Sequence, residues 1–71
     1  MKLFDCRVGS SGYVAHIGGG YETHRRLVDL GLLGASYCVR ARNRHSALVD
    51  FGAVSCVIQS SVAANIEIRE R

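Results

Sequence analysis

The stretch YETHRRLVDLGL, residues 21–32, is the one segment of this sequence with a convincing helical pattern. Leu27 and Leu30 stand three residues apart, as on one face of a helix, and Gly31 follows where a left-handed residue ends many helices. The pattern therefore predicts a helix over Tyr21–Leu30, about three turns long.

A helix this short is only marginally stable by itself and needs a surface to pack against. We therefore expect Leu27 and Leu30 to lie against a sheet. Leu32 and Leu33, which follow the expected cap, are predicted to fill the same core.

Before the helix, residues 13–17 alternate with the period of two that is typical of a strand. The alternation places Tyr13, Ala15 and Ile17 on one face and Val14 and His16 on the other. Three consecutive glycines, residues 18–20, then favour the end of the strand, because glycine loses the most conformational freedom in regular structure.

After the helix, the period of two returns and predicts a hairpin with a turn over residues 43–46. Its first strand has Tyr37, Val39 and Ala41 on one face and Cys38, Arg40 and Arg42 on the other; Ala47, Val49 and Phe51 alternate in the second strand. A further strand carries Val54, Cys56 and Ile58, and residues 66–69 form the last one. Between these two strands, Ser60 or Ser61 is predicted to cap a single helical turn.

The 71 residues form a single domain, 1–71, of mainly β class. We predict a small barrel of about five strands with one inserted short α-helix, closed so that no strand edge is exposed. The apolar and charged contents, 48% and 21%, are those of a globular protein, which argues against disorder. We expect a soluble protein without a signal peptide or membrane span. Three cysteines without paired spacing favour a reducing cytoplasm.

The sequence offers little support for catalysis, and we predict a protein that is not an enzyme, with no catalytic residues and no cofactor. Phosphate-binding loops need a lysine after the glycines, and Lys2 is the sole lysine. Cys38 and Cys56 lie in alternating strands, where cysteine usually serves as a small buried apolar residue. The three cysteines and three histidines could ligate a metal, but none has the close spacing of a metal motif, so no metal ligands are assigned.

The net charge of +3 equals the contribution of Arg40, Arg42 and Arg44, because the other basic and acidic residues balance at six each. Alternate residues of a strand share a face, so these arginines could contact phosphates or an acidic partner. A local basic tip differs from the broad basic face of a nucleic-acid-binding protein. Nucleic acid is therefore not an expected partner.

With these segments in place, the chain resembles the FeoA family, small cytosolic proteins associated with bacterial ferrous iron uptake. The residues that carry the resemblance are Leu3, 6–12 (CRVGSSG), Val14, Ile17, 25–32 (RRLVDLGL), Gly52, 57–59 (VIQ) and 63–66 (AANI). The family usually follows its Leu-Gly-Leu with a Pro-Gly turn, whereas this sequence has Leu33-Gly34-Ala35.

The resemblance implies an SH3-like barrel that docks on the cytosolic GTPase part of the membrane transporter FeoB. A related barrel occurs at the end of iron-dependent repressors, so a domain that binds or senses Fe(II) or another divalent metal is the alternative. Weak homo-oligomers are a further expectation. The predicted partner-binding residues are Arg25, Arg26, Leu32, Leu33, Arg40, Arg42 and Arg44.

Overall fold

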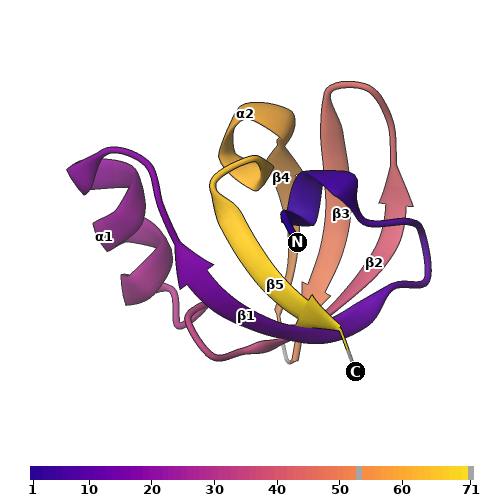
Figure 1. Ribbon diagram of the computed structural model, residues 1–71, viewed down its shortest axis with the longest axis horizontal. Helices are drawn as coiled ribbons and strands as arrows, with labels where there is room; N and C mark the ends of the chain where they lie inside the picture. Colours follow the sequence, from indigo (N-terminus) through magenta and orange to yellow (C-terminus); the bar gives the residue numbers. More distant parts are fainter. Residues whose placement is uncertain (53, 71) are drawn as a thin grey trace.

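Five antiparallel strands form one sheet in the order β4-β3-β2-β1-β5 (Figure 1). The computed structural model describes residues 1–52 and 54–70. The strands are β1 (Ser11–Ile17), β2 (Ser36–Arg42), β3 (Ser46–Phe51), β4 (Val54–Gln59) and β5 (Ile66–Glu70). The helices are a 3-10 turn, η1 (Leu3–Asp5), the longer α1 (Tyr21–Asp29) and the single turn α2 (Ser60–Ala63). The predicted β class, the five strands and the inserted helix are confirmed.

Strand β1 lies between β2 and β5 and pairs with both. Its register with β5 shifts between Val14 and His16, which marks a β-bulge. A bulge changes which residues face inward, and both Val14 and Ile17 are buried, each 1% exposed. The prediction that these two side chains lie on opposite faces was wrong, because strict alternation does not hold across the bulge.

The prediction of a fully closed barrel was also wrong. Within residues 1–52 and 54–70, no ladder joins β4 to β5, and these two strands are the edges of the sheet. The short helices fill the space instead: α2 connects the two edge strands (Figure 1), and Ala63 in α2 and Leu3 in η1 are both buried. The short helices thus cover the core at the place where β4 and β5 were expected to pair through hydrogen bonds.

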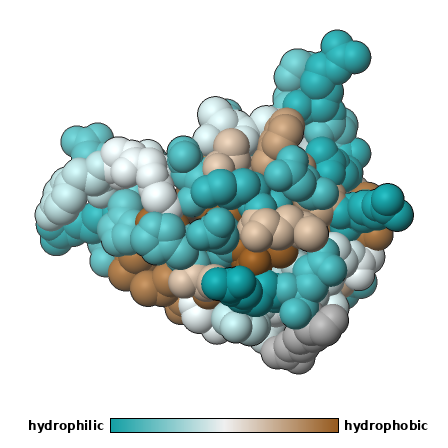
Figure 2. All heavy atoms as spheres, viewed as in Figure 1, coloured by the Kyte–Doolittle hydropathy of each residue, from teal (hydrophilic) through white to brown (hydrophobic). Residues whose placement is uncertain are grey.

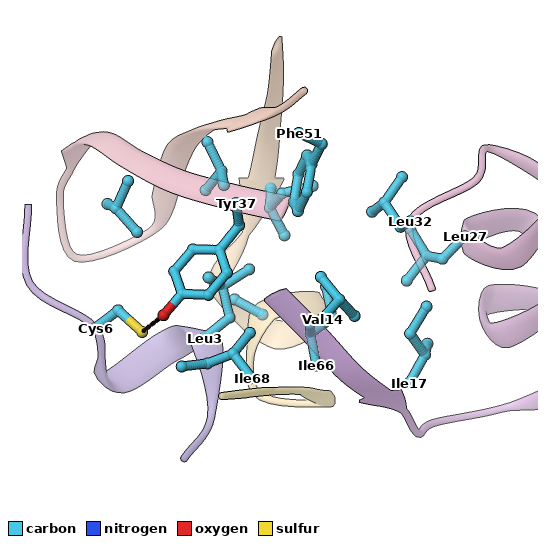
Figure 3. Packing of buried hydrophobic residues seen from close by; sticks show 14 residues of the cluster. Leu3, Cys6, Val14, Ile17, Leu27, Leu32, Tyr37, Phe51, Ile66 and Ile68 are labelled. Carbon is cyan, nitrogen blue, oxygen red and sulfur yellow. Dashed lines mark hydrogen bonds between the residues drawn. The ribbon is translucent and has the colours of Figure 1, made fainter. Parts of the chain in front are cut away.

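One apolar core extends from η1 through the sheet to α1 (Figure 3). Its buried members are Leu3, Cys6, Val14, Ile17, Leu27, Leu32, Tyr37, Val39, Val49, Phe51, Ile58, Ala63, Ile66 and Ile68. The Cys6 thiol donates a weak hydrogen bond to the Tyr37 hydroxyl at 3.9 Å, and Ser10 Oγ lies 3.2 Å from the same oxygen. Burial raises the pKa of Tyr37 above its usual value, so this polar end of the core stays uncharged near neutral pH.

Helix α1 extends away from the sheet at the end of β1 (Figure 1). It ends as the sequence predicts: Gly31 has φ of 81°, its N–H donates to the Val28 carbonyl, and the Leu32 N–H donates to the Leu27 carbonyl. These two bonds are the Schellman motif, and the buried side chains of Leu27 and Leu32 supply its usual apolar contact.

The packing predicted for the other two leucines was wrong. Leu30 is 62% exposed and Leu33 is 50% exposed. The chain turns sharply at Gly31, so the contact with the sheet is confined to Leu27, Leu32 and the partly buried Val28.

The role predicted for Ser60 or Ser61 as the cap of α2 was wrong as well. Gln59 is the N-cap, and it makes no side-chain capping bond. Ser60 Oγ instead donates to the Arg44 carbonyl at 2.9 Å, which ties α2 to the turn between β2 and β3. No helix among the described residues is long and apolar enough to cross a bilayer.

We predict that Gly12→Ser destabilises the protein by about 2 kcal/mol or more, the cost of an overpacked site. A Cβ at Gly12 would lie 1.9 Å from the Arg69 carbonyl oxygen, so β1 and β5 would have to separate. The free energy of unfolding from urea titration measures the effect.

The matched control is Gly20→Ser. Gly20 has extended backbone at the N-cap of α1, a Cβ added there would meet nothing within 4 Å, and serine is a favourable N-cap residue. We expect this variant to be as stable as the parent or slightly more stable. Equal stabilities for the two serine variants would contradict the close approach of β1 and β5.

Candidate partner-binding surface

The predicted partner-binding residues fall into two separate regions. Arg25, Arg26, Leu32 and Leu33 belong to α1 and its exit, while Arg40, Arg42 and Arg44 belong to the β2–β3 hairpin. These regions lie at opposite sides of the molecule in Figure 1, so they do not form one surface. Leu32 is 2% exposed and serves the core, whereas Leu33 is available at the surface.

The hairpin arginines do not form the basic cluster that strand alternation predicts. The register of β2 with β3 shifts between Val39 and Ala41, so Arg40 lies at a bulge. Arg40 pairs with Asp50 across the sheet. Arg42 donates to the Cys6 carbonyl, and its guanidinium carbon lies 5.8 Å from the centre of the Phe4 ring.

Arg44, the third hairpin arginine, is exposed near the turn. In Figure 2, hydrophilic side chains project at this tip of the hairpin. Because the charge of Arg40 is paired and Arg42 holds η1, the hairpin has less free positive charge than its three arginines suggest.

Asp50 has two polar partners on the outer face of the sheet. The Ser55 hydroxyl donates to Oδ1, and the Arg40 guanidinium donates to Oδ2. The Ser55 hydrogen bond, followed by that of Arg40, lowers the pKa of Asp50, and the same pairing raises the pKa of Arg40. This cluster therefore joins β2, β3 and β4 and stabilises the sheet.

The exposed face of α1 combines apolar and charged side chains. An open concavity of about 570 Å³ is lined by Tyr21, Glu22, Arg25, Arg26, Asp29 and Leu30. Tyr21 is 73% exposed, and its hydroxyl accepts a hydrogen bond from Arg25 at 3.2 Å. Arg25 also lies 3.8 Å from Asp29, one helical turn further on. We call this set, together with Leu33, the α1 face.

Four members of the α1 face were missing from the residues predicted from the sequence: Tyr21, Glu22, Asp29 and Leu30. Tyr21 stands four residues before Arg25, a spacing that brings side chains together on a helix, so this neighbour was detectable. Leu30 was assigned to the core because it shares the apolar spacing of Leu27. Only the position of the turn at Gly31 shows that Leu30 faces outward.

His24 fixes the start of α1 to the strand before it. Its Nδ1 lies 2.7 Å from the Ile17 carbonyl oxygen, which spans the glycine segment 18–20. Because a carbonyl oxygen can only accept, Nδ1 is the donor of this hydrogen bond. The α1 face is thus positioned by His24 at its beginning and by Leu27 and Leu32 at its end.

The structure does not assemble the cysteines and histidines into a reactive group. Cys6 is buried, and Cys38 and Cys56 are partly buried in separate strands of the sheet. In the described part of the chain, no hydrogen bond joins a cysteine to a histidine, and no three His, Cys, Asp or Glu side chains lie close enough to hold a metal ion.

Comparison with known proteins adds a structural relationship. No family model and no curated protein matches this sequence. The crystal structure of an iron uptake regulatory protein (FeoA) is similar with a TM-score of 0.89 and 26% identity, covering 100% of this chain and 97% of that chain. The solution structure of the FeoA protein from Chlorobium tepidum has a TM-score of 0.89 and 25% identity, covering 99% of this chain and 70% of that chain.

A manganese-dependent transcriptional repressor is also similar, with a TM-score of 0.90 and 24% identity. The match covers 100% of this chain but 41% of the repressor, so the chain corresponds to less than half of that protein. At this identity, the likeness shows the fold alone.

These comparisons define the class of protein as a small SH3-like β domain. Within this class, the chain has the FeoA-family fold over its whole length, and the resemblance found in the sequence is confirmed.

We predict that Asp50→Asn changes how stability depends on pH. The pKa of Asp50 is lowered in the folded protein. The ionised carboxylate therefore stabilises the fold above the pKa of an unfolded Asp, near 4, and this stabilisation is lost as the pH falls through the pKa of the folded state. The parent should therefore lose more thermal stability between pH 6 and pH 2 than Asp50→Asn does. Parallel melting curves that keep a constant separation over this range would contradict the assignment.

Proposed function

We propose that this protein is an accessory protein of ferrous iron uptake that acts in the cytoplasm as a protein-interaction module. Its partner is the cytosolic GTPase part of a FeoB-like membrane transporter. The observation that carries the proposal is the α1 face, an exposed set of apolar and charged side chains on a helix that extends from a FeoA-like fold.

The composition of the α1 face suits binding to another protein. Tyr21, Leu30 and Leu33 are half or more exposed, although their side chains would gain from burial. Tyrosine and arginine are the residue types that contribute most often to binding energy in protein interfaces. The face therefore combines apolar anchors with charged side chains that can set orientation.

The charges of the α1 face balance overall, two arginines against Glu22 and Asp29, so an acidic group of the partner is favoured only locally, at Arg26. Arg25 is balanced by Asp29, whereas Arg26 is exposed and has no ion-pair partner among the described residues. An acidic group on the partner near Arg26 would speed association more than it would strengthen the complex. Binding should weaken as salt rises, because exposed charges are screened.

We predict that Arg26→Glu and Leu30→Asp each weaken binding to the isolated GTPase domain by about tenfold or more, as expected for interface residues. Both side chains are exposed, so the fold should be retained. Isothermal titration calorimetry at low salt measures the affinity, and circular dichroism checks the fold of each variant.

Arg69→Glu is the matched control for the charge reversal, because Arg69 is exposed on β5 and lies outside the α1 face. We expect it to bind like the parent. Equal losses for Arg69→Glu and Arg26→Glu would show that overall charge, and not the α1 face, determines binding. No binding by the parent at low salt would contradict the proposal itself.

The alternative function is binding or sensing of Fe(II) or another divalent metal, and it draws on the fold shared with the manganese-dependent repressor. Its candidate ligands are the side chains of the three cysteines and the three histidines, and no three of them lie together in the described structure. Bound metal stabilises a folded protein in proportion to the logarithm of its concentration.

We predict no rise in the melting temperature that grows with Fe(II) concentration under reducing, oxygen-free conditions, because no group of three ligands lies together in the described chain. A rise that grows with Fe(II) concentration and disappears in the Cys38→Ser, Cys56→Ser variant would favour the metal function over the interaction module.

A further inference from the structure

Strand β4 is an open edge of the sheet in the sense that one side of its backbone has no hydrogen-bonding partner among the described residues. It pairs with β3 over all six of its residues, from Ser46↔Gln59 to Phe51↔Val54, without a bulge. In the described part of the chain, no strand, loop or side chain bonds to the other side of β4. An open concavity of about 540 Å³ lies beside it, lined by His45, Ser46, Val57, Gln59, Ser60 and Ser61.

The other edge of the sheet, β5, is protected in ways that β4 is not. Lys2 forms an isolated bridge with Glu67, and the Ile68 N–H donates to the Met1 carbonyl, so the N-terminal residues cover this edge. The sequence of β5, IEIRE, also carries three charges, whereas that of β4, VSCVIQ, carries none. Charges, proline and bulges are the usual protection of an edge strand, and β4 has none of them over its six residues.

An apolar row crosses the outer face of the sheet and ends at this open edge. The registers align Ala41 of β2 with Leu48 of β3, and Leu48 with Val57 of β4. Leu48 is 38% exposed and Val57 is 69% exposed. The row stops at the edge of the sheet, and a strand added beside β4 would extend it.

We propose that β4 pairs antiparallel with β4 of a second copy of this chain, with Val57 facing Val57 of the copy. This register aligns Ser55 with Gln59 and Cys56 with Ile58 across the two-fold axis, and it joins the two apolar rows into one. The proposal uses no residue of the α1 face and does not depend on the proposed function.

A second copy is favoured as the occupant because the strand is complementary to itself. A neutral strand meets no like-charge repulsion when two copies face each other, a repulsion that a charged strand would suffer. The two-fold arrangement also brings the most exposed apolar side chain of β4 against an identical one, which buries both. The contact is a single ladder of strands, so the dimer is weak, with a dissociation constant of about 10 µM to 1 mM.

Sedimentation equilibrium of the full chain at up to about 1 mM tests the pairing, since this range spans weak association. We expect the parent to dimerise reversibly, and Val57→Lys and Val57→Glu to raise the dissociation constant at least tenfold, because each places like charges at the axis. Mixed in equal amounts, the two variants should form a heterodimer, since opposite charges then meet. Val8→Lys, also at an exposed valine but outside β4 and the α1 face, should dimerise like the parent.

Cross-linking tests the register. In a Cys38→Ser, Cys56→Ser background, where buried Cys6 remains, Val57→Cys should form a disulfide-linked dimer with oxidised glutathione. Ser55→Cys should not, because Gln59 of the copy faces it, whereas Ser55→Cys combined with Gln59→Cys should.

A parent that stays monomeric throughout the concentration range would overturn the proposal. Dimers that persist equally in Val57→Lys and Val57→Glu would also overturn it, as would cross-linking of the single Ser55→Cys variant. Binding of an extended peptide from another protein by a chain that stays monomeric would assign the edge to a different occupant and reject the self-pairing. Loss of binding to the GTPase domain would leave these results unchanged, so the two proposals fail separately.

Discussion

The backbone of Gly12 lies directly against the carbonyl of Arg69, and this approach joins the first strand of the sheet to the last. Strand β1 also pairs with β2, so one strand connects both halves of the molecule. No side chain fits at Gly12, and the position is demanded by close packing and not by a positive φ. The core depends on this arrangement because Val14 and Ile17 of β1 pack with Ile66 and Ile68 of β5 (Figure 3).

Two bulges then determine what the sheet offers to solvent. The bulge in β1 turns both Val14 and Ile17 inward, and the one in β2 separates Arg40 from Arg42. Arg40 is held by Asp50 on the outer face, whereas Arg42 reaches the Cys6 carbonyl and the ring of Phe4 in η1. Arg40 stabilises the pairing of neighbouring strands, whereas Arg42 stabilises a contact between elements distant in the sequence. Two of the three hairpin arginines therefore make contacts within the molecule. The α1 face has more exposed apolar and charged side chains that are suited to binding a partner.

The sequence was sufficient for features that depend on local patterns. Alternation placed Val49 and Phe51 on one face of a strand, and both are buried, while Gly31 identified the end of α1. It was insufficient where one residue shifts a strand register, since a bulge leaves no mark in a pattern of apolar residues. Contacts such as Arg42 with the Cys6 carbonyl join residues 36 positions apart and have no local signal. Of the α1 face, the sequence predicted Arg25, Arg26 and Leu33, which are exposed in the structure, but assigned Leu30 to the core, because spacing alone cannot show where a helix meets the sheet.

Helix α1 is held to the rest of the molecule by few contacts: the His24 bond to the Ile17 carbonyl and the packing of Leu27, Leu32 and Val28. Elements with little buried apolar area open at lower free-energy cost than the whole domain unfolds. The amide hydrogens of α1 should therefore exchange with solvent faster than those of β1 and β3 within the sheet. A ligand that binds α1 would slow amide exchange in the helix without changing the exchange rates of the sheet. Exchange in α1 therefore measures how much ligand is bound, independently of the folding equilibrium of the whole domain.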